Sequence, residues 1–169
     1  MQPSGCMKTP RDPSRPIEHP DGSEEAVTRS VVLDVEPEQA WRMIGTEEGL
    51  AQWLGAEVTA APEAGGALRL VDDDGVERRG RILDVEHGRR LRFTWSPADG
   101  DDDLGEASTV TLSLDRTPAG ATRVTVVEAR SGGRVAACLD AGAAWDQRLV
   151  GLELGALVGR SALVGAAWL

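Results

Sequence analysis

The sequence predicts an α+β fold in which a curved antiparallel β-sheet wraps around a long C-terminal helix. Short segments with alternating apolar side chains recur between residues 27 and 128, a pattern typical of antiparallel strands. After residue 135 the apolar spacing becomes helical. Two short helices are expected directly after the first strand. Because a sheet with one apolar face must bury it against another element, we expect the long helix to lie in the concave face of the sheet.

The first strand and the two short helices occupy residues 27–54. Apolar side chains alternate over residues 27–35, as expected for a strand. Pro37 fits the first turn of one helix, because its missing N–H is not needed there. Thr46 fits the start of a second helix. Trp41, in the first helix, is expected to pack against the sheet.

The next strands form a meander. Residues 68–70 mark one strand, and the turn at 72–75, which ends in Asp-Gly, leads into a return strand over residues 76–86. We expect Gly80 at a bulge. The inward face of this return strand stays open, because it carries apolar side chains on both faces.

Three further strands, over residues 90–96, 109–114 and 124–128, have clearer phases, which brings the sheet to about six strands. Their expected inward positions are Leu91, Phe93, Trp95, Val110, Leu112, Leu114, Val124, Val126 and Glu128. In the last helix, which starts between residues 135 and 145, the apolar stripe consists of Trp145, Leu149, Leu152 and Ala156. The apolar residues 158–169 are expected to be a helix end that packs on the domain.

Composition predicts one domain, over residues 26–169, behind a disordered tail over residues 1–25 that contains five prolines. With 28 acidic and 18 basic side chains the net charge is −10, which disfavours binding to nucleic acid or anionic membranes. Two cysteines give no disulfide framework, and no export signal or span long enough for a bilayer is found. We therefore expect a cytoplasmic protein without membrane insertion.

A sheet that curls around a helix without closing on it tends to leave an apolar cavity, and small ligands bind in such cavities. Aromatic side chains at inward positions fill a core more often than they contact a ligand, but their shared interior makes them the best candidates for a cavity lining. The predicted ligand-binding residues are Trp53, Phe93, Trp95, Glu128, Trp145 and Leu149.

Glu128 has two interpretations. Its phase points the carboxylate inward, where burial raises the pKa unless a partner such as Arg81 or Arg148 lies close. Alternatively, the strand frays near residues 131–133 and Glu128 is solvated. A buried Glu128 could orient a polar ligand group or act as an acid or base.

No residue pattern predicts a metal site, a cofactor or a catalytic set. His19 and His87 have no second ligand or nucleophile at a fixed spacing. The acidic segments 72–74 and 99–103 lack the calcium-loop spacing and are expected to be solvated turns. Cys138 fits a small buried apolar role.

Together, residues 37–53, 80–95 and 145–152 make the chain resemble the START-like (SRPBCC), helix-grip superfamily, in the branch named for the activator of the heat-shock protein 90 ATPase. The resemblance implies a cavity that holds a hydrophobic or amphipathic small molecule, in a stress or regulatory setting. We expect a monomer or homodimer. The resemblance leaves open a cyclase, dehydratase or hydrolase in the same cavity, or a co-chaperone-like interaction module. We do not expect chaperone activation, because the chain has no room for the additional domain that engages the chaperone.

Overall fold

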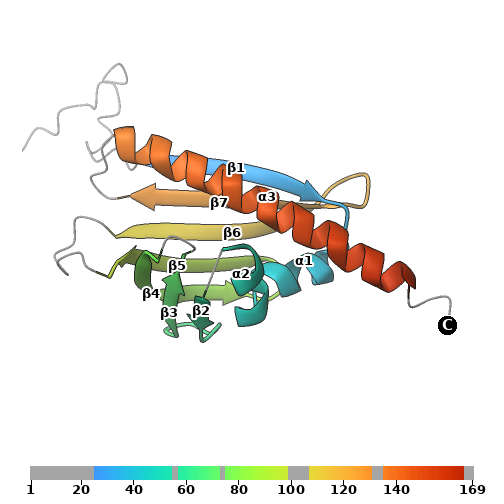
Figure 1. Ribbon diagram of the computed structural model, residues 1–169, viewed down its shortest axis with the longest axis horizontal. Coiled ribbons are helices and arrows are strands. Elements are labelled where there is room, and N and C mark those ends of the chain that lie inside the picture. The colour runs from blue at the N-terminus through green and yellow to red at the C-terminus, as the bar shows by residue number, and fades with distance from the viewer. Residues whose placement is uncertain (1–24, 55–56, 73–74, 99–106, 131–134, 166–169) are drawn as a thin grey trace, which may run out of the picture.

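The computed structural model describes residues 25–54, 57–72, 75–98, 107–130 and 135–165. Its elements are β1 (Glu25–Leu33), α1 (Pro37–Ile44), α2 (Glu47–Trp53), β2 (Glu57–Ala60), β3 (Ala67–Val71), β4 (Glu77–Glu86), β5 (Arg90–Pro97), β6 (Ser108–Arg116), β7 (Thr122–Arg130) and α3 (Val135–Gly165). Figure 1 shows α3 running diagonally across one face of the sheet, with α1 and α2 beside it on the same face. The α+β, helix-grip fold is confirmed.

The sheet is antiparallel, and its strands follow the order β1-β7-β6-β5-β4-β3-β2. Pairing of β1 with β7 brings the first and last strands together at one edge, where α3 also contacts β1. The prediction of about six strands missed β2. Its four residues alternate between exposed and buried, but so short a pattern is weak evidence for a strand without its partner β3.

The short helices begin where the sequence predicts. Pro37 is the first residue of α1, and the Thr46 hydroxyl accepts a hydrogen bond of 3.0 Å from the Gly49 N–H at the start of α2. Trp41 is 3 % exposed, and its indole N–H donates to His87 Nδ1 at 3.1 Å, in the turn between β4 and β5. These contacts attach the helical pair to the sheet, as predicted for Trp41.

The bulge in β4 lies at Leu83 and not at Gly80, which corrects the prediction. Gly80 pairs regularly with Trp95, and a Cβ atom there would collide with the backbone carbonyl of Thr94 on β5. Glycine is therefore needed for close strand approach. The register shifts between Ile82 and Asp84, so Leu83 turns outward, while residues 82 and 85 both face the core. The bulge thus settles the inward face that the sequence left open.

The predicted inward positions of β5, β6 and β7 are all buried, as is the stripe of α3. Helix α3 extends to Gly165, but Val158 is 70 % exposed, so the predicted packing of the C-terminal run is not seen at that residue. Most of the predicted disordered tail, the acidic segment 99–103 and the side chain of Cys138 lie outside the described residues.

Candidate functional site

The most unusual group in the core is the carboxylate of Glu128, on β7. The residue is 3 % exposed, because β7 stays paired on both sides as far as Arg130. The interpretation in which the strand frays and Glu128 is solvated is therefore wrong. A buried carboxylate requires compensating hydrogen bonds, since transfer of an unpaired charge from water is costly.

Three hydrogen bonds from three elements supply that compensation. Ser108 Oγ on β6 donates to Oε1 of Glu128 at 2.5 Å, and Trp95 Nε1 on β5 donates to the same oxygen at 3.2 Å. Trp145 Nε1 on α3 donates to Oε2 at 2.7 Å. The guanidinium of Arg130 adds an ion pair, with Nε 3.5 Å from Oε1. The carboxylate therefore ties α3 to the centre of the sheet.

The protonation of Glu128 follows from these contacts. Burial raises its pKa, but the hydrogen bonds from Ser108, Trp145 and Trp95 and the positive charge of Arg130 outweigh burial, so the pKa lies below its ordinary value. Glu128 is thus a fixed anion at neutral pH. The sequence predicted a raised pKa only for a buried carboxylate without a close partner, and here the partners are present.

Aromatic rings pack around this anion. Trp95 and Trp145 are stacked, with centroids 5.6 Å apart and an interplanar angle of 19°. Phe93 meets Trp95 edge to face at 5.5 Å, and Trp53 lies 6.2 Å from Trp145. Such contacts add stabilisation to the burial of apolar area. Both indole N–H groups that reach Glu128 are held in place by this packing.

A cavity of about 300 Å³ opens beside Glu128, between the sheet and the first half of α3. Its lining residues are Arg78, Trp95, Glu128, Arg130, Asp140, Ala141, Ala144 and Arg148. Five of these eight side chains are charged, so the cavity differs from the mostly apolar one that the sequence predicts.

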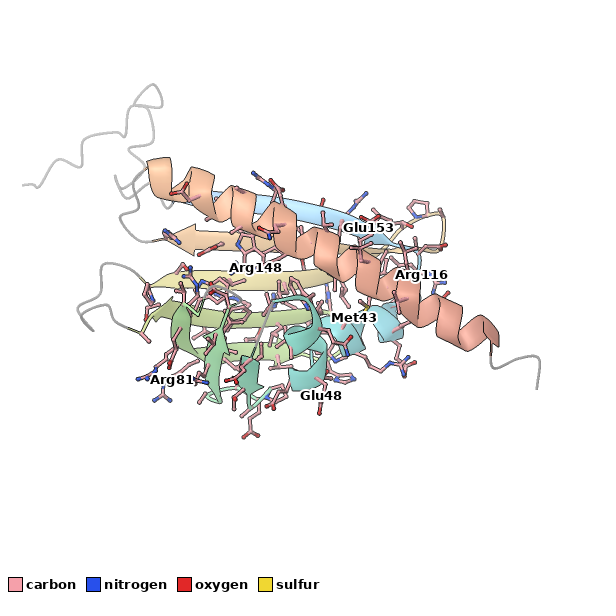
Figure 2. All side chains as sticks on the ribbon, viewed as in Figure 1. Met43, Glu48, Arg81, Arg116, Arg148 and Glu153 are labelled. Carbon is pink, nitrogen blue, oxygen red and sulfur yellow. The ribbon has the colours of Figure 1, made fainter. Side chains whose placement is uncertain are left out.

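Two arginines lie over the tryptophans at this cavity. The Arg148 guanidinium carbon is 5.2 Å from the ring centroid of Trp145 and 5.4 Å from that of Trp95, and Arg78 lies 5.1 Å from the Trp95 ring. Cation–π attraction favours this placement. Burial lowers the pKa of Arg148, as does the charge of Arg78, and the carboxylates of Glu128 and Asp72 partly oppose that change. Figure 2 shows Arg148 between α3 and the sheet.

The structure separates the six predicted site residues into two groups. Trp95 and Glu128 line the cavity. The other four, which are buried in the core, are Trp53, Phe93, Trp145 and Leu149. Of the two predicted partners of Glu128, Arg148 lies at the same cavity. Arg81 is exposed and does not line it.

Sequence reasoning missed Arg78 and Arg130 as lining residues. Arg78 shares its face of β4 with Gly80 and Ile82, so knowing the bulge position would have pointed it inward. Arg130 follows Glu128 at a spacing of two on β7, which places both on one face. The sequence contains this spacing, but the alternative in which the strand frays near residues 131–133 left the orientation of Arg130 open.

Other candidates for chemistry are accounted for by local contacts. His87 accepts from Trp41, and Asp72 accepts from the Val76 N–H within the hairpin turn. Among the described residues, no group of three or more His, Cys, Asp or Glu side chains is arranged to hold a metal ion. Within the described residues, no helix combines the length and apolar character needed to cross a membrane.

Comparison with known proteins decides the family. The profile described as "Activator of Hsp90 ATPase homolog 1-like protein" matches residues 34–153, which include α1, α2, β2 to β7 and the cavity-lining part of α3. The chain belongs to this family. The predicted START-like (SRPBCC) superfamily is thereby confirmed, with the branch that the resemblance indicated. No curated protein matches the chain significantly.

Solved structures of similar proteins agree with an Activator of Hsp90 ATPase homolog 1-like fold. MLL2253 from Mesorhizobium loti is 27% identical, with a TM-score of 0.67 over 80% of this chain and 98% of that one. DynU16, from the dynemicin biosynthetic locus, is 24% identical, with a TM-score of 0.69 over 79% of this chain and 48% of that one. The Aha1 dimer from Colwellia psychrerythraea is 13% identical, with a TM-score of 0.64 over 76% of this chain and 93% of that one.

Proposed function

We propose that the chain binds a hydrophobic or amphipathic small molecule in the cavity between the sheet and α3. The observation that supports this most is the cavity itself, about 300 Å³ in volume, whose lining combines Trp95 and two alanines with five charged side chains. Ligand pockets combine apolar walls with a few placed polar groups and span about 300–1,000 Å³. This cavity is at the small end of that range.

Binding is favoured over acid–base catalysis by the state of Glu128. A general acid must hold a proton near neutral pH, whereas the pKa of Glu128 is lowered. Its two oxygens already accept hydrogen bonds from Trp95, Ser108 and Trp145. We therefore assign the carboxylate to holding the cavity wall in place, which weakens the cyclase, dehydratase or hydrolase alternative.

The setting of this binding function is part of the proposal. DynU16, which is described as a protein in the dynemicin biosynthetic locus, has the same fold, and this association with biosynthesis supports a small-molecule ligand here. We place the protein in the cytoplasm because its two cysteines give no disulfide framework, and we assign it to stress response or regulation by analogy with its superfamily.

Native mass spectrometry of the protein purified from its own host tests the binding function. We expect a stoichiometric small molecule that dissociates on activation and is identified after organic extraction. Ala144→Trp fills the cavity from α3 and should abolish the bound mass, whereas Ala143→Trp, at the exposed neighbouring position, should retain it. An apo mass in every growth condition would contradict the proposal, as would equal occupancy in both variants.

A second candidate function, self-association, is supported by the outer side of α3. Its apolar side chains at i, i+4, i+7 and i+8 are more than half exposed: Val150, Leu154, Leu157 and Val158. Contiguous apolar patches mark interaction sites, and the Colwellia psychrerythraea relative is described as a dimer. Sedimentation velocity tests this: we expect a dimer that Leu154→Gln converts to monomer, and a wild-type monomer at micromolar concentration would contradict it.

A further inference from the structure

The cavity brings together positive charges that lack anionic partners. Arg78 on β4 and Arg148 on α3 both lie over the Trp95 ring, at 5.1 and 5.4 Å. Within the described part of the chain, neither forms an ion pair within 4.0 Å. Arg78 Nε is also buried without a hydrogen-bond partner. Two guanidinium groups that share one ring repel each other, and a buried unsatisfied donor is unfavourable.

The carboxylates that line the cavity form no ion pair with these two arginines. Both oxygens of Glu128 are occupied by the donors from Ser108, Trp95 and Trp145, and its ion pair is with Arg130. Asp140 is exposed at the rim, where solvent screens its charge. The charges of Glu128 and Asp72 attract Arg148 and compensate part of its charge. Among the described residues, however, no carboxylate forms an ion pair with Arg78 or Arg148, so this wall of the cavity keeps two guanidinium groups without a direct anionic partner.

We propose that the ligand of this cavity is an organic acid whose anionic group binds Arg78 and Arg148. The proposal rests on the proposed binding function and names its ligand class. A carboxylate is planar and accepts two parallel N–H donors from a guanidinium, so one group can satisfy the free Arg78 Nε and separate the two like charges. Ala141 and Ala144, on the same face of α3 as Arg148, leave space for a compact apolar body beside the anionic group.

A matched pair of probes tests this: naphthalene-2-carboxylate and the neutral naphthalene-2-methanol, titrated calorimetrically against the full chain. The two differ in charge and share the apolar body. We expect the acid to bind at least about tenfold more tightly than the alcohol, because charge-assisted hydrogen bonds are added, and the difference to shrink as salt is raised. Inorganic phosphate, a third probe, should bind weakly because it has no apolar body.

Substitutions test whether the two arginines cause the tighter binding of the acid than of the alcohol. Arg78→Gln and Arg148→Met should each remove most of it, whereas Arg81→Gln, on the exposed face of the same strand, should keep it. Arg148→Met retains an apolar stem against the tryptophans. If circular dichroism nevertheless shows that Arg148→Met is unfolded, Arg78→Gln alone tests whether the arginines bind the anionic group.

The outcomes separate the two proposals. Equal binding of acid and alcohol would overturn the organic-acid assignment and leave the binding function standing. The organic-acid assignment would also be overturned if Arg78→Gln still bound the acid more tightly than the alcohol, or if phosphate bound as tightly as the acid. If neither organic probe binds and the protein from its own host is also free of ligand, the binding function fails together with the inference.

Discussion

Replacing Glu128 with glutamine removes the negative charge from the centre of the fold while keeping the size of the side chain. The carboxylate accepts from Ser108 and Trp95 on one oxygen and from Trp145 on the other. An amide has a single acceptor oxygen, and its NH₂ group can only donate. In Glu128→Gln at least one of these donors therefore faces another donor.

The expected loss of stability follows from these contacts. A hydrogen bond to a charged group contributes about 1.5–3 kcal/mol, and a buried donor left unsatisfied costs about 1–3 kcal/mol. The lower desolvation cost of a neutral amide offsets part of this sum. We expect Glu128→Gln to lower the free energy of unfolding by about 3 kcal/mol, or the melting temperature by roughly 6–12 °C.

The loss should depend on pH. The folded-state pKa of Glu128 lies below its ordinary value of 4.5, so its contribution is fully present above that pH. As the pH falls from there through the folded-state pKa, the unfolded chain takes up the proton first and the contribution disappears. The difference between wild type and Glu128→Gln should therefore be largest at neutral pH and shrink in acid.

Urea denaturation at pH 7 and at a series of values below pH 4.5 measures this difference. Glu153→Gln, an exposed carboxylate on α3 (Figure 2), is the matched control and should change stability by less than about 0.5 kcal/mol. A loss for Glu128→Gln no larger than the control would refute the assignment of Glu128 as the tie between helix and sheet. A large loss that stays constant into acid would refute the charged state.

Three further predictions concern individual contacts. Trp145→Phe keeps a ring but removes an indole donor, and should cost about 1–3 kcal/mol in urea denaturation; wild-type stability would contradict this. Gly80→Ala places a methyl group against a carbonyl of β5, and should lower the melting temperature in calorimetry; an unchanged melting temperature would contradict this, because it would mean that β5 can shift away at little cost in stability. Hydrogen bonds from Arg69 and Arg79 lower the pKa of Glu77 to about 2; in an NMR titration Arg69→Gln should raise it, and no rise would contradict the assignment.

Much of the site's framework could be predicted because burial is periodic along a strand or helix. The alternation that ends at Glu128 and the helical spacing that begins at Trp145 each placed their side chains inward. A strand of only four residues is too short to show a clear alternation, and a one-residue bulge interrupts the alternation, so β2 and the bulge at Leu83 were not predicted. Without the bulge, the sequence could not show whether Ile82 or Leu83 faces inward, and so could not place Arg78 on the inward face.

The sequence by itself determined the fold class, the inward phase of most strands and the superfamily, because local periodicity and motif spacing are properties of neighbouring residues. Only the tertiary structure decided what surrounds Glu128. Its three donors lie 17, 20 and 33 positions away in the chain, and no local pattern records contacts made when separate strands and α3 pack together. Since a carboxylate's pKa depends on such contacts, the sequence could point Glu128 inward but could not predict that it stays charged.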